Sequence, residues 1–306
     1  MIKRTLYFEN PAYLSLKNQQ LVVKYPTVEN EVENTKTVPI EDIGIVILAN
    51  QQITITHGAI AALLDNNCAV VTCNNRNFMP QGLLLNLEGN TLQSERFTAQ
   101  IKASQPLKKQ LWQQTIQAKI INQANILQTI QKQEVKNMLK WANDVRSGDS
   151  SNLEGRAAAY YWKNIFPSLK NFVRGADEEP PNNLLNYGYA ILRAVIARAL
   201  VGSGLLPTLG IHHHNRYNAY CLADDIMEPY RPFVDKLVVK IVDSGVDFQE
   251  LSKEIKTKLL QIPVLDVMIN GQRSPLMLAA GQTSASLARC YLKEIRKIVY
   301  PSFEQP

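Results

Sequence analysis

The sequence predicts an α+β protein in which a small N-terminal β-strand domain is followed by a larger, all-α domain. Short β-rich segments follow one another from Thr5 to about Leu87. After roughly Gln93 the spacing of apolar residues changes to the period of an α-helix and stays there to the C-terminus. A chain of 306 residues is also long enough for two domains. We therefore expect a β domain over residues 1–92 and an α domain over residues 93–306.

Seven segments of the first domain have the β-branched and aliphatic residues that are typical of strands. Turn-forming residues such as Asn18, Pro26 and Pro39 separate them, at the spacing of a small sheet or sandwich. One helix is expected among them, over HGAIAALLDNN at residues 57–67. The predicted strands are TLYF (5–8), YLSLK (13–17), QLVVKY (20–25), IGIVILA (43–49), QQITIT (51–56), CAVVTC (68–73) and GLLLNL (82–87).

The second domain has a long glutamine-rich segment that Pro106 can start, because proline is tolerated in the first turn of a helix. Apolar residues at helical spacing predict that one face of this helix is turned to the core. They are Leu107, Leu111, Ile120, Ala124 and Leu127. A polar break, SGDSSN at residues 147–152, follows, and Glu154 opens the next helix, LEGRAAAYYWKNIF.

The most apolar helix candidate runs from Leu184 to Val201. It is interrupted by Asn186, Arg193 and Arg198, so it predicts a buried core helix and not a membrane span. Gly204 is the residue expected to close it. The N-terminus lacks the apolar segment and cleavage site of a signal peptide. We expect a cytoplasmic protein with no membrane partner.

Composition limits the classes of partner and chemistry. Lysine and arginine number 33 and the acidic residues 27, a net charge of +6, which favours a polyanion such as nucleic acid without establishing one. The four cysteines form no CxxC pair, so buried free thiols are expected. A nucleophilic pair of Cys221 with a histidine is a less favoured alternative, since no orienting or oxyanion group accompanies it.

Three of the four histidines are consecutive, at positions 212–214. A surface loop that tolerates histidines would explain this run, but the acidic residues that follow favour a functional site. The segment ADDIMEPYRP predicts a helix in which Asp225 and Glu228 are three residues apart. That spacing places both carboxylates on one face, where they can point at a shared ion. Asp224 is expected to be an exposed residue of the first turn, favoured by the helix dipole.

One imidazole with two or three carboxylates forms a ligand set dominated by oxygen, which favours Mg²⁺ or Mn²⁺ over structural zinc. Such an ion suits phosphate chemistry, because a phosphodiester is charged and reacts slowly without a Lewis acid. The sequence has no Walker A loop and no GxGxxG motif, which disfavours nucleotide hydrolysis and dinucleotide redox chemistry. Metal-dependent phosphoester chemistry is therefore the predicted class.

Three separated segments, in order, carry a resemblance to a known family: EGRAAAYYW (154–162), LLNYGYAIL (184–192) and LGIHHHNRYNAYCLADDIMEPYRP (209–232). The similarity extends to RTLYFENPAYLSL, VPIEDIG and PLKKQLWQQTIQAKI, and so covers nearly the whole chain. The chain resembles the universal CRISPR-associated endonuclease/integrase of spacer acquisition (adaptation), in its type II form.

This resemblance implies a homodimer, with an N-terminal β domain for dimerisation and partner contact and an α-helical catalytic domain that binds the metal. The implied histidine lies three residues after Gly210. The family has a single histidine where this chain has three, so His212 or His214 is an alternative ligand. The catalytic residues and metal ligands implied by the resemblance are Glu154, His213 and Glu228, with Asp225 in support.

The resemblance also implies the reaction. With a small second CRISPR adaptation protein, the dimers hold a short duplex of foreign DNA, the protospacer, and join each 3′ end into the CRISPR array at the leader–repeat boundary. The 3′ hydroxyl is the nucleophile of a transesterification, the metal polarises the phosphodiester, and no nucleoside triphosphate is needed. A proton-shuttle role for His213 ranks below its ligand role. The implied partners are double-stranded DNA of the protospacer and repeat, and further type II adaptation and effector proteins.

Basic residues of the second domain are candidates for DNA phosphate contacts. One group recurs at helical spacing near the C-terminus and the other follows the Glu154 helix; a solvated helix face explains any one of them equally well. The candidates are Lys163, Arg174, Arg289, Lys293 and Arg296.

Two other functions remain open. A non-catalytic DNA-binding scaffold of the same fold would bind DNA tightly without a metal, with a strong dependence on salt. A helical metallohydrolase of small phosphoesters would be active without any DNA affinity.

Overall fold

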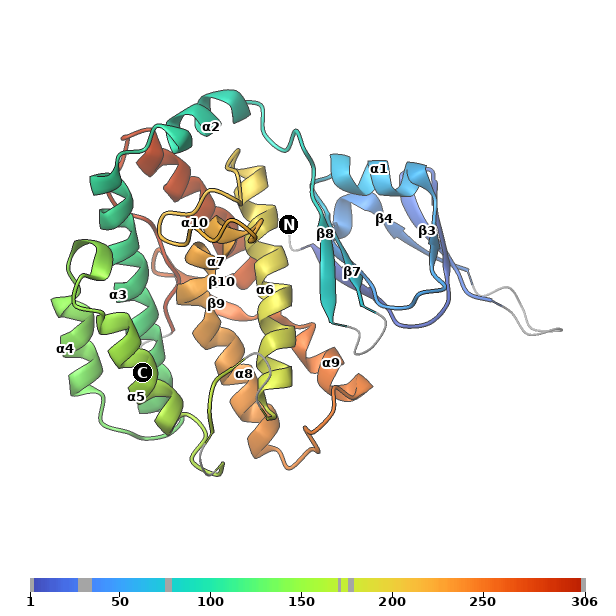
Figure 1. The fold of residues 1–306 in the computed structure, drawn as a ribbon. Helices are drawn as coiled ribbons and strands as arrows, with labels where there is room; N and C mark the ends of the chain where they lie inside the picture. The colour runs from blue at the N-terminus through green and yellow to red at the C-terminus, as the bar shows by residue number, and fades with distance from the viewer. Residues whose placement is uncertain (1–2, 27–34, 75–78, 170–171, 176–178, 304–306) are drawn as a thin grey trace. The chain divides into compact units, whose positions relative to one another are not determined.

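The chain divides into two compact units, Met1–Thr91 and Leu92–Pro306 (Figure 1). The first is built from strands with one α-helix and the second mainly from helices, which confirms the predicted α+β class. The computed structural model describes residues 3–26, 35–74, 79–169, 172–175 and 179–303.

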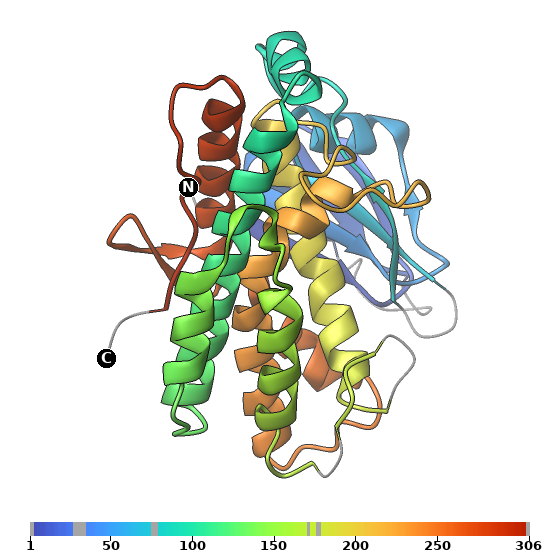
Figure 2. The same ribbon diagram turned by 60° about the vertical axis from the view of Figure 1, so that its left-hand side comes forward.

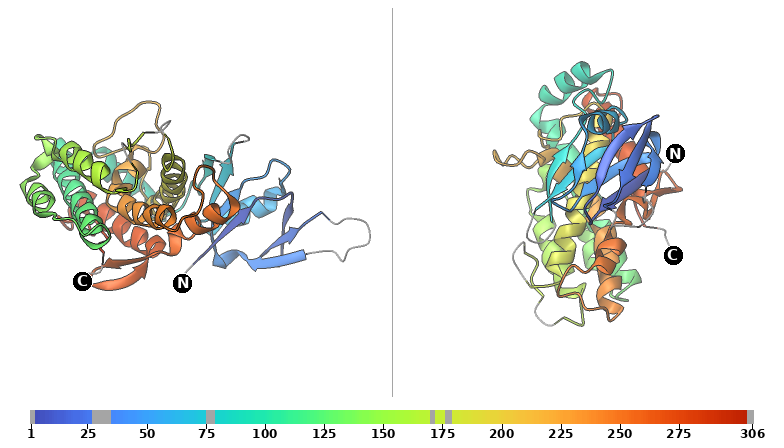
Figure 3. Two further views of the ribbon diagram at one scale, coloured as in Figure 1. Left: turned by 90° about the horizontal axis from the view of Figure 1, so that it is seen from below. Right: turned by 90° about the vertical axis from the view of Figure 1, so that its right-hand side faces the viewer.

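The N-terminal unit contains two four-stranded sheets (Figure 3). Its elements are β1 (Arg4–Phe8), β2 (Tyr13–Lys17), β3 (Gln20–Lys24), β4 (Thr35–Pro39), the 3₁₀ turn η1 (Ile40–Asp42), β5 (Ile43–Leu48), β6 (Thr54–Ile55), α1 (His57–Asp65), β7 (Ala69–Cys73) and β8 (Pro80–Leu84). One sheet has the order β1-β5-β7-β8, with β8 antiparallel to three parallel strands. The other has the order β4-β3-β2-β6, antiparallel except for the parallel pair of β2 and β6.

The core of this unit lies between the sheets and α1, where Leu14, Leu21, Ile43 and Leu63 are fully buried. All seven predicted strands and the predicted helix are present, although the fifth strand is reduced to β6. Strand β4 was not predicted, because its segment TKTVP lacks a clear strand pattern. This strand forms by pairing with β3, in which Val38 lies opposite Leu21.

The C-terminal unit is a helical bundle. Its elements are α2 (Gln93–Ile101), α3 (Gln105–Thr129), α4 (Lys136–Asp144), η2 (Ser147–Asp149), α5 (Leu153–Asn164), α6 (Asn182–Gly202), α7 (Cys221–Met227), η3 (Glu228–Tyr230), α8 (Arg231–Asp243), α9 (Lys253–Leu259), η4 (Ile262–Val264), β9 (Asp266–Ile269), β10 (Gln272–Pro275) and α10 (Leu276–Tyr291). The long helix α3 packs against α4, α5, η3 and α8, and Figure 2 shows it beside α4 and α5. Residues that α3 presents to these neighbours therefore lie at the centre of the bundle.

Helix α3 begins as predicted. The hydroxyl of Ser104 accepts a hydrogen bond from the backbone N–H of Leu107, and Pro106 occupies the first turn, where the missing N–H costs nothing. Four of the five predicted core-facing residues are fully buried, and Leu107 is half-buried. The apolar period was therefore a correct guide to the buried face of this helix.

Helix α6 is long and apolar enough, by length and composition alone, to cross a membrane. In this structure 78% of its most apolar window is buried within the chain, against α7, α8 and α10. It is the core helix that the sequence predicted. The helix ends at Gly202, and Gly204, which follows the C-cap Ser203, has a left-handed φ of 67°; the N–H of Leu205 donates to the carbonyl of Leu200 at 2.9 Å.

The expectation that everything after Gln93 is helical is wrong for β9 and β10, which form an antiparallel hairpin at the edge of the helical unit (Figure 2). The two turn residues, Asn270 and Gly271, have φ values of 51° and 74°. Positive φ at both positions defines the type I′ turn that asparagine–glycine pairs favour. The Asn-Gly signal was present in the sequence, but helical apolar spacing on both sides obscured it.

Candidate active site

The turn that precedes α5 fixes Glu154 at the start of this helix. Oδ1 and Oδ2 of Asp149 accept the backbone N–H groups of Leu153 and Glu154, both at 2.9 Å. Oδ1 of Asn152 accepts the N–H of Gly155 at 3.2 Å. These side chains satisfy amides that have no partner inside the helix. The prediction that Glu154 opens a helix is confirmed.

Lys119, from the middle of α3, connects Glu154 to Glu228. Its Nζ atom lies 2.7 Å from Oε1 of Glu154 and 2.6 Å from Oε2 of Glu228. Oε1 of Glu228 pairs with Nη2 of Arg231 at 3.0 Å. Because both carboxylates contact one buried ammonium, they lie within reach of a single cation.

The surrounding charges keep Glu228 and Lys119 ionised. Burial by itself would raise the pKa of Glu228, but the positive charges of Arg231 and Lys119 outweigh burial and lower this pKa. Burial would lower the pKa of Lys119, but the carboxylates of Glu228 and Glu154 outweigh it and raise this pKa. Glu228 is therefore a carboxylate at neutral pH, which is the form that binds a metal.

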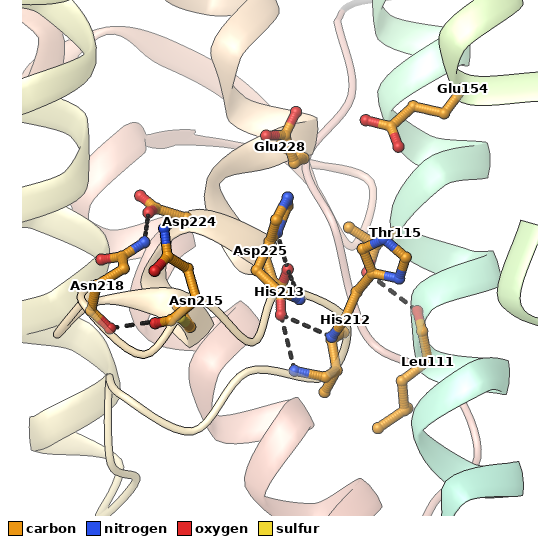
Figure 4. Close-up of polar contacts among 12 residues, drawn as sticks. Leu111, Thr115, Glu154, His212, His213, Asn215, Asn218, Asp224, Asp225 and Glu228 are labelled. Carbon is orange, nitrogen blue, oxygen red and sulfur yellow. Dashed lines mark hydrogen bonds and ion pairs between the residues drawn. The ribbon is translucent and has the colours of Figure 1, made fainter. Parts of the chain in front are cut away.

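His213 is held by Asp225, whose Oδ1 atom lies 2.5 Å from the Nδ1 atom of the imidazole. Figure 4 shows the other ring nitrogen, Nε2, turned toward Glu228. The hydrogen bond to Asp225 raises the pKa of His213 above its ordinary value, against the effect of burial. A carboxylate on one ring nitrogen and a free second nitrogen form the arrangement of a metal-binding histidine.

Asp225 also shapes the loop that carries the histidines. Its two oxygens accept the backbone N–H groups of Ile211 (2.7 Å), His212 (2.9 Å) and His213 (3.2 Å). A Cβ atom at Gly210 would lie 2.3 Å from the carbonyl oxygen of His213, so only glycine fits there. The expectation that Asp225 and Glu228 point at one ion is wrong in this structure, because Asp225 is directed at the loop while Glu228 faces Lys119.

The other two histidines have different surroundings. The ring of His212 stacks on Trp112, with ring centroids 4.1 Å apart and an interplanar angle of 2°. His214 is exposed. Of the three, His213 is the one whose ring is oriented by a carboxylate and turned toward the glutamates.

The expectation that Asp224 is an exposed residue of the first turn is wrong. The residue is buried, its Oδ1 atom lies 2.6 Å from Nε of Arg193 on α6, and its Oδ2 atom accepts a hydrogen bond from Asn218 at 2.7 Å. It therefore ties the loop after the histidines to the core helix. All four cysteines are buried free thiols, as predicted. Burial raises the pKa of Cys221, which opposes a role as nucleophile.

The chemistry of the donor atoms suits a hard divalent cation, although their present spacing does not yet form a metal site. Across the described ranges, no group of three or more His, Cys, Asp or Glu side chains is arranged closely enough to hold a metal ion. The ammonium of Lys119 instead lies between the two glutamates, where it acts as the cation that joins them. Oε2 of Glu228 is buried and makes no hydrogen bond, despite its ion-pair contact with Lys119. Two carboxylates and a free imidazole nitrogen are ligands that Mg²⁺ and Mn²⁺ accept.

The predicted DNA-contact residues differ in their surroundings. Lys163 is exposed in the last turn of α5. The guanidinium of Arg174 donates to the side chains of Asn182 and Asn186 and lies 5.3 Å from the ring centroid of Tyr189. These contacts favour a structural role for Arg174 inside the helical unit.

The expected helical spacing of Arg289, Lys293 and Arg296 is wrong, because α10 ends at Tyr291. Lys293 has a left-handed φ of 63°, and the N–H of Glu294 donates to the carbonyl of Arg289 at 3.0 Å. This is the pattern that commonly ends a helix. Arg289 pairs with Glu294 through Nε and Oε2 at 3.0 Å, whereas Lys293 and Arg296 are exposed beyond the helix end.

Lys119 and Arg231 are residues of the site that were not predicted from the sequence. A signal existed, since Lys119 follows the buried Trp112 by two helical turns and Ile116 by one, and so belongs to the buried face of α3. A lysine at such a position is almost never buried without acidic partners. That rule would have pointed to Lys119 without naming Glu154 and Glu228 as the partners.

Comparisons with known proteins identify relatives of this chain. The family model of "CRISPR associated protein Cas1" matches residues 6–259. The CRISPR-associated endonuclease Cas1 of Neisseria meningitidis serogroup C (strain 8013) is 35% identical, over 94% of this chain and 91% of that protein.

Two solved structures share the fold. A casposase bound to integration product superposes with a TM-score of 0.77 and 21% identity, over 97% of this chain and 92% of that chain. A Cas6-RT-Cas1–Cas2 complex superposes with a TM-score of 0.74 and 19% identity, over 99% of this chain and 36% of that chain. At these identities the superpositions show the fold alone.

Proposed function

Because the chain belongs to the Cas1 family of CRISPR-associated proteins, we propose that it is a metal-dependent DNA endonuclease and integrase that inserts short foreign DNA into a CRISPR array. The observation that carries this proposal is the convergence of Glu154 and Glu228 on one buried ammonium, with Nε2 of His213 turned toward them. The 35% identity with an endonuclease over most of both chains supports the class of reaction.

We assign the metal ligands to Glu154, Glu228 and Nε2 of His213, and the ion to Mg²⁺ or Mn²⁺. Such an ion, when bound, supplies a Lewis acid for the target phosphodiester. Asp225 holds the proton on Nδ1 of His213, so that Nε2 keeps its lone pair. Arg231, which contacts Glu228, adds a positive charge beside the phosphate that the site is proposed to bind.

The joining step conserves phosphodiester bonds. The 3′ oxygen of the protospacer strand forms a bond to a phosphorus atom of the repeat, and the bond from that phosphorus to its own 3′ oxygen breaks. The proton of the attacking hydroxyl passes to solvent or to the leaving oxygen. One phosphodiester replaces another, which is why no nucleoside triphosphate is required.

We further propose that the chain acts as a homodimer on double-stranded DNA, together with a small Cas2 protein. Support for the DNA and Cas2 partners comes from solved structures of the same fold, one a casposase bound to integration product and one a complex that contains Cas1 and Cas2. The homodimer rests on the family resemblance alone. The net charge of +6 is compatible with a DNA partner. Contact with further type II adaptation and effector proteins stays a prediction.

An integration assay with two matched donor duplexes tests the proposal. The purified chain is incubated with the small partner, Mn²⁺, a supercoiled plasmid that carries the repeat array, and a labelled duplex with either 3′-hydroxyl or 3′-dideoxy ends. We expect label to enter the plasmid only from the 3′-hydroxyl donor and only with metal. The E154A and E228A variants should lose this activity while they keep the helical content of the parent protein.

Undiminished joining by both variants would contradict the assigned site. Tight DNA binding with strong salt dependence, but with no binding of Mg²⁺ or Mn²⁺ and no joining, would instead support a non-catalytic scaffold.

A further inference from the structure

Asp235 is a buried carboxylate of the helical unit that is not among the assigned metal ligands. Asp235, on α8, is 1% exposed and accepts hydrogen bonds from two tyrosine hydroxyls. Tyr161 of α5 donates to its Oδ2 atom at 2.9 Å, and Tyr189 of α6 donates to its Oδ1 atom. A carboxylate is costly to bury unless its oxygens are satisfied, and here two hydroxyls from two other helices satisfy them. Asp235 therefore joins α5, α6 and α8 at one point.

Tyr161 is connected to Glu154 through helix α5, to which both residues belong. Tyr161 follows Glu154 by seven residues on α5, which is two helical turns and places both side chains on the same face. The two residues are about 10 Å apart along a continuous helix. Tyr161 is fully buried, and its contact with Asp235 ties α5 to α8.

Tyr189 is connected to Glu228 through the side chain of Arg231. The guanidinium of Arg231 lies 4.8 Å from the ring centroid of Tyr189, and its Nη2 atom lies 3.0 Å from Oε1 of Glu228. Fixing the hydroxyl of Tyr189 on Asp235 fixes the ring on which Arg231 rests. Arg231 in turn holds one oxygen of Glu228 and leaves the other toward Lys119.

We infer that Asp235, Tyr161 and Tyr189 form a positioning network that sets the placement of Glu154 relative to Glu228. The inference rests on the proposed function, since it concerns the same two carboxylates. None of the three residues is assigned a contact with DNA or metal; each acts through a helix or through a neighbouring side chain. Two glutamates that must bind one ion tolerate little change in separation, so supports of this kind govern metal affinity as well as turnover.

The variants Y161F and Y189F test the network, because each removes one hydroxyl and keeps the ring. Mn²⁺ binding is measured by calorimetry on the full chain without DNA, and the joining assay gives kcat and the KM for DNA. We expect the Kd for Mn²⁺ to rise about 10–100-fold, as is usual when a support of a ligand is lost. We expect kcat to fall at a fixed Mn²⁺ concentration and to recover in part with excess Mn²⁺, with the KM for DNA unchanged.

D235N is a third variant of the same network. The amide of asparagine has one acceptor oxygen, and a donor NH2 group replaces the other oxygen. It can therefore accept a hydrogen bond from only one of the two tyrosine hydroxyls. We expect its effect on the Mn²⁺ Kd to be at least as large as that of either phenylalanine variant.

Y300F is the matched control. The hydroxyl of Tyr300 hydrogen-bonds with Oγ1 of Thr115 at 2.8 Å in the same helical unit. This variant loses a comparable hydrogen bond, so its melting temperature should fall, while its Mn²⁺ affinity and kcat should equal those of the parent protein. Y160F, which removes a hydroxyl bonded to the backbone of Glu134, controls for changes elsewhere on α5.

The inference is overturned if Y161F and Y189F match Y300F in Mn²⁺ affinity and in kcat. E154A is measured in parallel to separate this outcome from failure of the proposed function. If E154A keeps Mn²⁺ binding and joining, the proposed site itself fails. If E154A loses both while the two phenylalanine variants keep both, the metal site stands and the positioning network fails.

Discussion

The Nδ1 atom of His213 lies 2.5 Å from Oδ1 of Asp225, which leaves Nε2 as the free nitrogen of this ring. His212 stacks on Trp112 and His214 is exposed. We therefore expect H213A to lower metal-dependent joining by at least about 100-fold, beyond the usual effect of losing a supporting group. H212F, which keeps an aromatic ring on Trp112, and H214A should retain activity within a few-fold. Joining rates of the three variants at one Mn²⁺ concentration check this, and loss in H214A but not in H213A would reverse the assignment.

Asp225 should matter for stability as well as activity. It is fully buried and accepts three backbone N–H groups of the histidine loop in addition to the imidazole. D225A would leave these donors without their acceptor, and hydrogen bonds to a charged group contribute about 1.5–3 kcal/mol each. We expect the free energy of unfolding to fall by about 3 kcal/mol or more, in urea titrations followed by tryptophan fluorescence. If D225A lowers the free energy of unfolding by less than the surface variant H214A does, Asp225 does not stabilise the histidine loop in this way.

The site was only partly predictable from sequence. The histidine run and Glu228 could be found because their segment joins a rare cluster of histidines to an acidic helix, but the resemblance was needed to select His213 within the run. Glu154 could not be found, since nothing local separates a first-turn glutamate from any other, and the family resemblance was needed to select it. Lys119 was missed because its contact with Glu154 joins residues 35 positions apart on different helices. Such long-range contacts leave no periodic signal.

The fold was predictable where one face of a segment is buried. The period of α3 and α6 identified both core helices, because burial against several neighbours requires a continuous apolar stripe. It failed for β4, which is stabilised by pairing with β3 and has little apolar pattern of its own. The apolar period also failed to predict β9 and β10. This short hairpin lies inside a helical region and contributes too few residues to change the local period.

Lys119 should act as the internal counter-ion of the metal-free site. K119M keeps much of the side-chain volume but removes the cation between Glu154 and Glu228, so that Arg231 is left as the partner of Glu228. Removing one partner of a buried ion pair costs about 3–5 kcal/mol, so the metal-free variant should melt at a lower temperature. Added Mn²⁺ should raise the melting temperature of K119M by more than that of the parent protein, because it replaces the missing charge. Equal Mn²⁺-induced shifts in thermal melts would argue against this role.

DNA affinity should depend on the exposed basic residues beyond α10. K293N and R296Q remove one charge each, and asparagine tolerates the left-handed backbone that position 293 requires. If each residue contacts a phosphate, each variant should lower the slope of log K against log salt by about one and weaken binding equally on all sequences. R289Q should change the slope less, because Arg289 already pairs with Glu294. Fluorescence anisotropy of a labelled duplex at several salt concentrations measures these slopes, and three unchanged slopes would remove this segment from the DNA surface.

Asp235 should make the helical unit lose stability as pH rises through weakly acidic values. Burial raises the pKa of its carboxyl from 3.8 to about 6, although Tyr189, Tyr161 and Arg231 oppose the increase. Between these two values the folded chain binds more protons at this position than the unfolded chain does. The stabilising contribution is therefore complete below pH 3.8 and is lost as pH rises through 6. A shift of about two units corresponds to about 3 kcal/mol.

Comparison with D235N isolates this contribution, since the asparagine does not titrate and all other groups cancel in the difference. Arg231, a charged group beside the carboxylate, stays protonated throughout the range and contributes no titration of its own. All three tryptophans, at positions 112, 141 and 162, lie in the helical unit, so their fluorescence reports its unfolding without interference from the N-terminal unit. The unfolding free energy of the parent protein minus that of D235N should fall by up to about 3 kcal/mol from pH 4 to pH 7. A difference that is constant with pH would mean that the carboxyl is ionised at its ordinary pKa, and that the two tyrosine hydroxyls are sufficient to offset its burial.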